Sequence, residues 1–268
     1  MSPLDGPLGG PVGGPVDGPV GAGARLRVAT CNVRELLDDG RVLREVLRAA
    51  AADVVCLQEV PTHPLAEHRL GDLAADAGLW VVAAGRPGAG TAVLAAARVD
   101  VRAAAVRALP VPRWRGRRPV RRRGAAEAVV RVAAGGGWSA EVLVRSVHLG
   151  LDAGERAAHA ALLVPPAAPA APCAPWARAA LVVAGDLNEG PGGRARAVLS
   201  GGLVDAAEVA GAPFPTFPAR APRHRLDAVL VDPRLAVAAV RTPAVERAER
   251  ATDHLAVVAD LLVPPAGG

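Results

Sequence analysis

Apolar residues recur along the chain in two spacings, which divide the sequence into expected strands and helices. Nearly continuous apolar runs of strand length, typical of strands buried on both faces, occur at 26–33, 53–60 and 180–188. Helical spacing of apolar residues occurs at 36–51, 64–77, 153–163 and near 193–199. Asp38 and Asp39 stand near the start of the first helical segment, where an aspartate side chain can cap free backbone amides.

Between residues 79 and 149 the pattern changes to short runs of strand character, separated by Gly-rich or Arg-rich turns as in a series of hairpins. These runs lie at 79–84, 91–97, 99–109, 125–134 and 138–149. Two further strands are expected at 224–231 and 254–262. Strand–helix alternation followed by hairpins is typical of an α/β (α+β) protein with mixed sheets and helices outside them.

Residues 25–263 are expected to form one domain, because compact α/β enzymes of this length are commonly single domains. Residues 1–24 are rich in Gly and Pro and cannot bury a core, so we expect a disordered tail there. A second, short tail is expected at 264–268. The sequence shows neither an apolar run of about 18 residues, as a membrane-spanning helix requires, nor a secretory signal.

Composition indicates a compartment and a codon bias. The three cysteines have no metal or redox spacing, which suits a reducing interior, so a cytoplasmic location is expected. Lys, Ile and Tyr are absent, as in proteins from a very GC-rich genome. Asn belongs to the same depleted group and occurs only at Asn32 and Asn188. We infer that these two asparagines have a function that Asp, Ser or Gly could not fulfil.

The net charge is +5, and all 31 basic residues are arginines. This charge favours phosphorylated or polyanionic partners, but it is equally explained if arginine is simply the only cation that the genome supplies. The segment 113–124 holds seven arginines around Trp114. It could bind phosphate backbones with Trp114 stacked on a base, or it could be a solvated hairpin loop, and the sequence favours neither.

Six segments place polar residues where otherwise apolar strands end. In sheet proteins, strand ends and their loops are where ligands bind. Each motif alone is weak evidence, since a GDxN after a strand is often only a turn. The six segments carry Asn32, Glu59, His148, Asp186 with Asn188, Asp227, and Asp253 with His254.

In this order the motifs N, QE, H, GDxN, D and DH resemble those of the endonuclease/exonuclease/phosphatase superfamily, which includes deoxyribonuclease I. The most specific pieces are QEV, GDLN and TDH, and the resemblance spans residues 25–263. It implies a four-layer α/β sandwich, in which two mixed β-sheets pack face to face with helices on the outside. It also implies a site at one edge of the sandwich that uses Mg²⁺ or Mn²⁺.

The resemblance also implies a role for each residue. Glu59 would be the principal metal ligand, with Asn32 and Asp253 completing or supporting the sphere, and hard cations do prefer such oxygen ligands. Asp186 would activate the attacking water, and Asn188 would donate its amide hydrogens to phosphoryl oxygens. His148 and His254 would contact the scissile phosphate as cations or donors. Asp227 would orient one of these histidines, and the sequence does not show which.

Arg223 and Arg225 are further candidates for contacts with the substrate. The leading hypothesis is a metal-dependent phosphodiesterase that acts as a monomer on nucleic acid or another phosphate ester. Within this class, a nuclease is favoured. A phosphatase or phospholipase acting on a small phosphorylated molecule or a lipid head group is the first alternative. A catalytically idle nucleic-acid-binding module is the second, and it would bind DNA in a salt-dependent way without turnover.

Overall fold

The structure is a computed structural model of the 268-residue chain that describes residues 23–63, 66–111, 121–134, 137–164 and 179–266. Most of the expected N-terminal tail and most of the arginine-rich segment 113–124 lie outside these ranges. The first strand begins at Ala24, within the expected tail. No helix in the described ranges is both long and apolar enough to cross a lipid bilayer.

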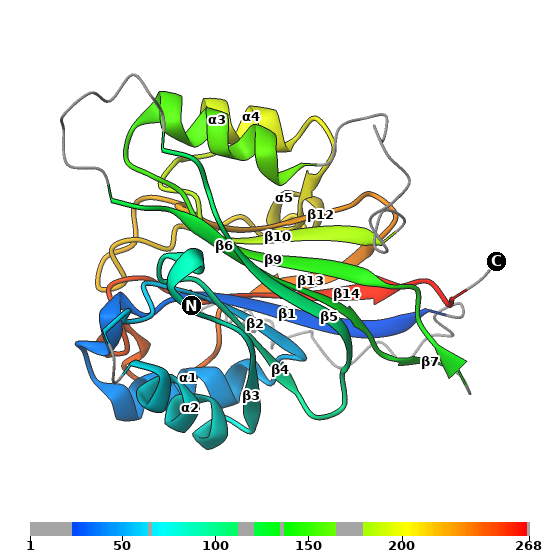
Figure 1. Cartoon of the computed structure of the whole chain (residues 1–268), viewed down its shortest axis with the longest axis horizontal. Helices are drawn as coiled ribbons and strands as arrows, with labels where there is room; N and C mark the ends of the chain where they lie inside the picture. The colour runs from blue at the N-terminus through cyan, green and yellow to red at the C-terminus, as the bar shows by residue number, and fades with distance from the viewer. Residues whose placement is uncertain (1–22, 64–65, 112–120, 135–136, 165–178, 267–268) are drawn as a thin grey trace, which may run out of the picture.

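Two six-stranded mixed sheets make up the centre of the molecule (Figure 1). Sheet A consists, from edge to edge, of β13 (Ala236–Arg241), β14 (Val257–Val263), β1 (Ala24–Asn32), β2 (Val54–Gln58), β4 (Ala92–Ala96) and β3 (Leu79–Ala83). Sheet B consists of β11 (Val204–Asp205), β12 (Asp227–Val231), β10 (Ala180–Asp186), β9 (Val142–His148), β6 (Gly124–Arg131) and β5 (Asp100–Ala108). A small ribbon pairs β7 (Ala133–Ala134) with β8 (Gly137–Trp138).

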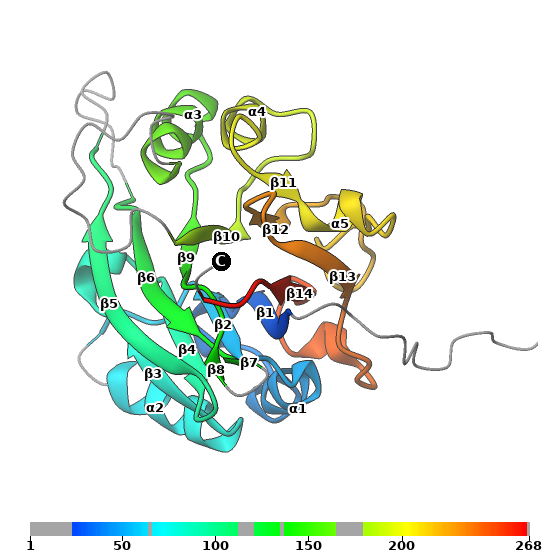
Figure 2. The same cartoon turned by 90° about the vertical axis from the view of Figure 1, so that its right-hand side faces the viewer.

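Helices cover the outer face of each sheet, so that the layers run helix, sheet, sheet, helix (Figure 2). Sheet A is covered by α1 (Gly40–Ala50) and α2 (Ala66–Asp76), and sheet B by α3 (Ala153–Leu163) and α4 (Arg194–Leu199). The remaining helical turns are α5 (Ala206–Val209), η1 (Arg34–Leu36), η2 (Arg86–Gly88) and η4 (Ala248–Arg250). The expected four-layer α/β sandwich is therefore confirmed.

Three buried apolar clusters fill the spaces between the four layers. Val54 of sheet A and Val144 of sheet B belong to the cluster between the sheets. Leu47 of α1 belongs to the cluster under sheet A, and Leu163 of α3 to the cluster over sheet B. Because each central strand touches two of these clusters, both of its faces are apolar, and this explains the nearly continuous apolar runs in the sequence.

The observed elements differ from the sequence expectations in several places. Helix α1 begins at Gly40, because the side chain of Asp39 caps it by accepting from the backbone N–H groups of Arg41 and Val42. Strands β12 and β14 begin three residues later than expected, so His254 lies in a loop before its strand. Strand β13 was not anticipated, because it is an edge strand whose side chains are mostly half-buried or exposed.

Helix α3 offers a matched test of the packing over sheet B. Leu163 is fully buried, whereas its neighbour Leu162 is 47% exposed. We expect Leu163→Ala to lower the free energy of unfolding by about 2–5 kcal/mol, because it leaves a cavity between helix and sheet. Leu162→Ala should change it by less than about 1 kcal/mol. Urea denaturation of both variants measures the difference, and equal losses would show that α3 does not pack as described.

Candidate active site

The polar residues at the strand ends meet at one edge of the sandwich. In sheet A, β1 and β2 run parallel with Asn32 opposite Gln58, so Glu59 follows directly beside Asn32. In sheet B, β9 and β10 run parallel with His148 opposite Asp186. Strand β12 runs antiparallel and starts with Asp227 opposite the same Asp186. Segments far apart in the sequence therefore deliver their side chains to one place.

Asn32 joins the two sheets at this edge. Its Nδ2 donates to Glu59 Oε1 at 3.1 Å and to Asp186 Oδ2 at 3.2 Å, while its Oδ1 accepts from the backbone N–H of Arg34 at 3.0 Å. Asn32 is 1% exposed, so these contacts are shielded from water. The carboxylates of Glu59 and Asp186 therefore face each other across a single amide.

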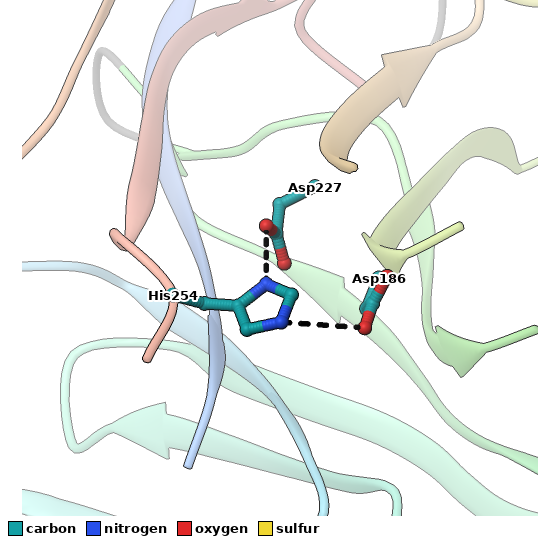
Figure 3. A group of neighbouring side chains, drawn as sticks. All are labelled: Asp186, Asp227 and His254. Atoms are coloured by element: carbon teal, nitrogen blue, oxygen red, sulfur yellow. Dashed lines mark hydrogen bonds and ion pairs between the residues drawn. The ribbon is translucent and has the colours of Figure 1, made fainter. Parts of the chain in front are cut away.

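His254 lies between two buried carboxylates (Figure 3). Its Nδ1 is 2.8 Å from Asp227 Oδ2, and its Nε2 is 3.9 Å from Asp186 Oδ2. Asp227 thus orients His254, which answers the question that the sequence left open. Burial lowers the pKa of His254, but the hydrogen bond and charge of Asp227 outweigh this effect and raise the pKa to about 9. The ring is therefore a cation at neutral pH.

Asp186 is an almost fully enclosed acid of the cluster. Its Oδ1 accepts from the backbone N–H of Asn188 at 2.8 Å, and it is 1% exposed. Burial and the nearby charge of Asp227 raise the pKa of Asp186 to about 6, against the opposing charge of His254. A carboxylate with a pKa near neutrality can accept a proton more readily than an ordinary aspartate.

The pKa of His148 bears on the sequence expectation that this residue acts as a cation or donor. Burial and the neighbouring charges of Arg123 and Arg121 lower the pKa of His148 well below its ordinary value of 6.5, so the ring is neutral. Its Nε2 lies 3.1 Å from Asn188 Nδ2 and accepts from that amide. The same Nδ2 also donates to the carbonyl of Leu149 at 2.9 Å. Asn188 must therefore release one of these partners before it can donate to another acceptor.

Two site residues have a left-handed backbone. Glu59 has φ 52° and Asn188 has φ 50°. Asparagine tolerates this region, whereas a glutamate adopts it at a cost of about 1–3 kcal/mol and so indicates a functional constraint. The backbone N–H of Glu35 donates to the carbonyl of Glu59 at 2.7 Å, which holds the turn in place.

The remaining candidates lie at the rim or away from the cluster. Asp253 is at the rim, where Arg34 Nε lies 3.7 Å from its Oδ2. Arg225 points elsewhere, because its Nη2 pairs with Asp205 at 3.0 Å and with Glu208 at 2.7 Å. This pairing engages the guanidinium inside the protein, so the expected substrate contact of Arg225 finds no support. Arg223 is exposed on the turn between Phe217 and His224, beside the site.

Several residues support the site in roles that the sequence did not indicate. Thr216 is fully buried, and its Oγ1 accepts from the backbone N–H of Asp227 at 3.3 Å. The ring of Phe217 lies 4.8 Å from that of His254, centroid to centroid. Gln58 is also fully buried, and its Nε2 donates to Ser146 Oγ at 3.1 Å from the other sheet. A neutral polar residue in an apolar run was the available signal for Gln58 and Ser146.

Several side chains of the site carry atoms that could bind a metal ion. Ligand atoms of Asp186, Asp227 and His254 lie within 4.8 Å of one another, close enough to hold a cation. A protonated imidazole cannot be a ligand, however, and Nδ1 of His254 is already bound to Asp227. The carboxylate oxygens of Glu59 and Asp186 are the hard donors that Mg²⁺ and Mn²⁺ prefer, so these residues fit such an ion. The Oδ1 of Asn32 accepts from the backbone N–H of Arg34, so Asn32 would support such a site by orienting the two carboxylates through its Nδ2.

Gly185 allows the two central strands of sheet B to approach beside the site. A Cβ atom at this position would lie 1.9 Å from the carbonyl oxygen of Val147, whereas one at Gly192 would meet nothing within 4 Å. We expect Gly185→Ala to lower the free energy of unfolding by about 1–3 kcal/mol or more, because it forces β9 and β10 apart. Gly192→Ala should leave it nearly unchanged. Denaturant titrations check both, and an unchanged Gly185→Ala would contradict the close strand contact.

Solved structures with the same fold were found by structural comparison. An endonuclease/exonuclease/phosphatase from Bacteroides vulgatus superposes with a TM-score of 0.71 at 21% identity, over 90% of this chain and 99% of that one. One from Beutenbergia cavernae gives a TM-score of 0.65 at 24% identity, over 90% and 72% of the two chains. A mannosyl-6-phosphatase from Bacteroides thetaiotaomicron gives 0.67 at 18%, over 88% and 99%.

At these identities the likenesses show a common fold. A comparison with curated protein sequences found no match. The model of the Endonuclease/Exonuclease/phosphatase family matches residues 29–254, which is most of the chain and includes every strand-end motif from Asn32 to His254. With the fold, the site and this match in agreement, the chain belongs to the endonuclease/exonuclease/phosphatase family, whose members hydrolyse phosphate esters.

Proposed function

We propose that this phosphoesterase cleaves phosphodiester bonds with the help of Mg²⁺ or Mn²⁺, and that its substrate is nucleic acid. The observation that carries the proposal is the cross-sheet contact of Asn32 with both Glu59 and Asp186, which gathers oxygen donors and a candidate base at one point. Hydrolysis of a phosphate ester needs such a point, because charge on the phosphoryl oxygens must be neutralised while a water is positioned in line.

The metal would be held by Glu59 as principal ligand, with Asn32 and Asp253 completing or supporting its sphere. When bound, the ion supplies positive charge to the phosphoryl oxygens. The side chain of Glu59 is 23% exposed, so an ion and a substrate can reach it from outside. Asp253 is more exposed still, at 38% of its side chain, in keeping with a supporting role at the rim.

Asp186 would accept a proton during the reaction, and His254 would stabilise the negative charge that develops. Asp186, with its raised pKa, takes a proton from the attacking water. His254 is held as a cation by Asp227 and donates from Nε2 to a phosphoryl oxygen, which becomes more negative as the bond breaks. Asn188 would donate to the same group after its amide leaves His148. His148, neutral in this state, would be an acceptor rather than a cation.

Nucleic acid is favoured by charge. The chain has a net charge of +5, and the described arginines of the segment 113–124 lie next to the site, since Arg121 and Arg123 both affect the pKa of His148. Nucleic acid presents a row of phosphates that such a surface can bind. A phosphomonoester remains the alternative to be tested, because one protein of this fold is a mannosyl-6-phosphatase.

A substrate panel with purified protein tests the proposal. Plasmid, single-stranded DNA, RNA, bis-p-nitrophenyl phosphate, p-nitrophenyl phosphate, inositol phosphates and sphingomyelin are each incubated with Mg²⁺, Mn²⁺ or EDTA. We expect turnover of DNA or RNA and of bis-p-nitrophenyl phosphate, lost in EDTA. Turnover of the monoesters alone would overturn the nuclease assignment but keep the hydrolase, and salt-dependent DNA binding without any turnover would overturn both.

Two substitutions test the assigned roles. Asp186→Asn should lower kcat by about 10²–10⁴-fold, the usual contribution of a general base, with the fold intact. Glu59→Gln should raise the Mg²⁺ concentration needed for half-maximal activity by about tenfold or more, since even outer-shell changes weaken metal binding by about 10–100-fold.

Glu246→Gln is the matched control, because its side chain is 90% exposed. It should change neither kcat nor the metal requirement. Near-normal activity of Asp186→Asn, or activity that persists in EDTA, would show that the proposed mechanism is wrong.

A further inference from the structure

An arginine without a direct ionic partner among the described residues lies beside the candidate active site. Two arginines are buried among the residues that the structure describes, Arg123 at 7% and Arg196 at 3% exposure. Arg196 has its partner, since Nη1 lies 2.7 Å from Asp205 Oδ2. Arg123 forms no side-chain hydrogen bond or ion pair with any residue in the described ranges. The guanidinium of Arg123 therefore keeps its hydrogen-bond donors available to a ligand.

The backbone around Arg123 is held in place. The carbonyl of Arg123 accepts from the backbone N–H of Leu109 at 2.8 Å. The next residue, Gly124, starts β6 where a Cβ atom would lie 2.2 Å from the carbonyl oxygen of Pro87. Only glycine fits so close to another backbone segment. The backbone of Arg123, directly before β6, is therefore held in a defined position.

Arg123 lies at the same edge of sheet B as the strand-end residues of the candidate active site. Strand β6 pairs with β9 so that Ala125 lies opposite Val147, which puts the start of β6 beside His148. The neighbouring strands β12, β10, β9 and β6 thus each bring one residue to this edge. In that order the residues are Asp227, Asp186, His148 and Arg123.

The charges confirm the proximity. Burial and the charge of Arg121 lower the pKa of Arg123, while the carboxylates of Asp186, Glu155 and Glu59 raise it. Arg121 itself is exposed and already paired, since its Nη2 lies 2.9 Å from Glu35 Oε1. Of the two, Arg123 is the cation that remains available to a bound anion.

We propose that Arg123 binds the anionic phosphoryl oxygens of the substrate, which would accept hydrogen bonds from N–H donors that no described residue uses. The planar guanidinium can bind two such oxygens at once. The inference deepens the proposed function and rests on it, because it assigns a substrate-binding residue to the same site. A purely structural arginine would be expected to form a direct hydrogen bond or ion pair, and none of the described residues forms one with the side chain of Arg123.

The test compares Arg123→Met with Arg122→Met, because Arg122 is the adjacent, exposed arginine. For bis-p-nitrophenyl phosphate in Mg²⁺, Arg123→Met should lower kcat/KM by about 10–100-fold, the usual value of charge-assisted hydrogen bonds. Arg122→Met should lower it by less than about threefold. The melting temperature without ligand should stay nearly equal in Arg123→Met, because no direct hydrogen bond or ion pair with a described residue is lost.

Two further measurements separate binding from folding. Inorganic phosphate should raise the melting temperature of the wild-type protein and of Arg122→Met, and this increase should be lost in Arg123→Met. Guanidinium chloride at non-denaturing concentration should restore part of the activity of Arg123→Ala, whereas the same concentration of sodium chloride should not.

The outcomes distinguish this proposal from the proposed function. If Arg123→Met melts well below the wild type, or keeps both its activity and its stabilisation by phosphate, Arg123 is structural and the proposal is wrong. If the wild type hydrolyses nothing but its stabilisation by phosphate still depends on Arg123, the anion site stands and the proposed function fails.

Discussion

Buried hydrogen bonds centred on Gln58 join the two sheets directly beneath the active site. Gln58 Oε1 accepts from Thr30 Oγ1 at 3.1 Å, and its Nε2 donates to Ser146 Oγ at 3.1 Å in the opposite sheet. The hydroxyl of Ser146 in turn donates to the carbonyl of Leu57 at 2.8 Å. Each of these groups would cost about 1–3 kcal/mol if left unpaired in the core. An apolar interface alone tolerates small shifts between sheets, whereas these bonds favour one alignment.

The active site depends on that alignment because each sheet supplies only part of it. Asn32 ends a strand of sheet A and Glu59 follows another, whereas Asp186 and His148 end strands of sheet B. The amide of Asn32 spans the two groups with contacts of 3.1 and 3.2 Å, lengths that a shift of one ångström would break. Gln58 precedes Glu59 in the chain, so the residue that aligns the sheets also positions the proposed metal ligand.

The strands and the site could be predicted because both produce local signals. Long apolar runs mark strands buried on both faces, and a polar residue at the end of such a run is conspicuous, as with Asp186. What depends on neighbours from elsewhere in the chain could not be predicted. The neutral state of His148 results from burial and two nearby arginines, and Arg225 turns to Asp205 rather than to the substrate side. The isolation of Arg123 is likewise visible only when its surroundings are known.

The pairing of the first and last strands has a consequence for synthesis of the protein. Strands β1 and β14 lie side by side in the middle of sheet A, with Ala24 opposite Val263 (Figure 1). A growing polypeptide therefore cannot complete this sheet until residues 257–263 have left the ribosome, and contacts so distant along the chain form slowly. His254 is made just before that segment. A copy that stops before His254 consequently lacks both the central strand β14 and the imidazole that Asp227 orients.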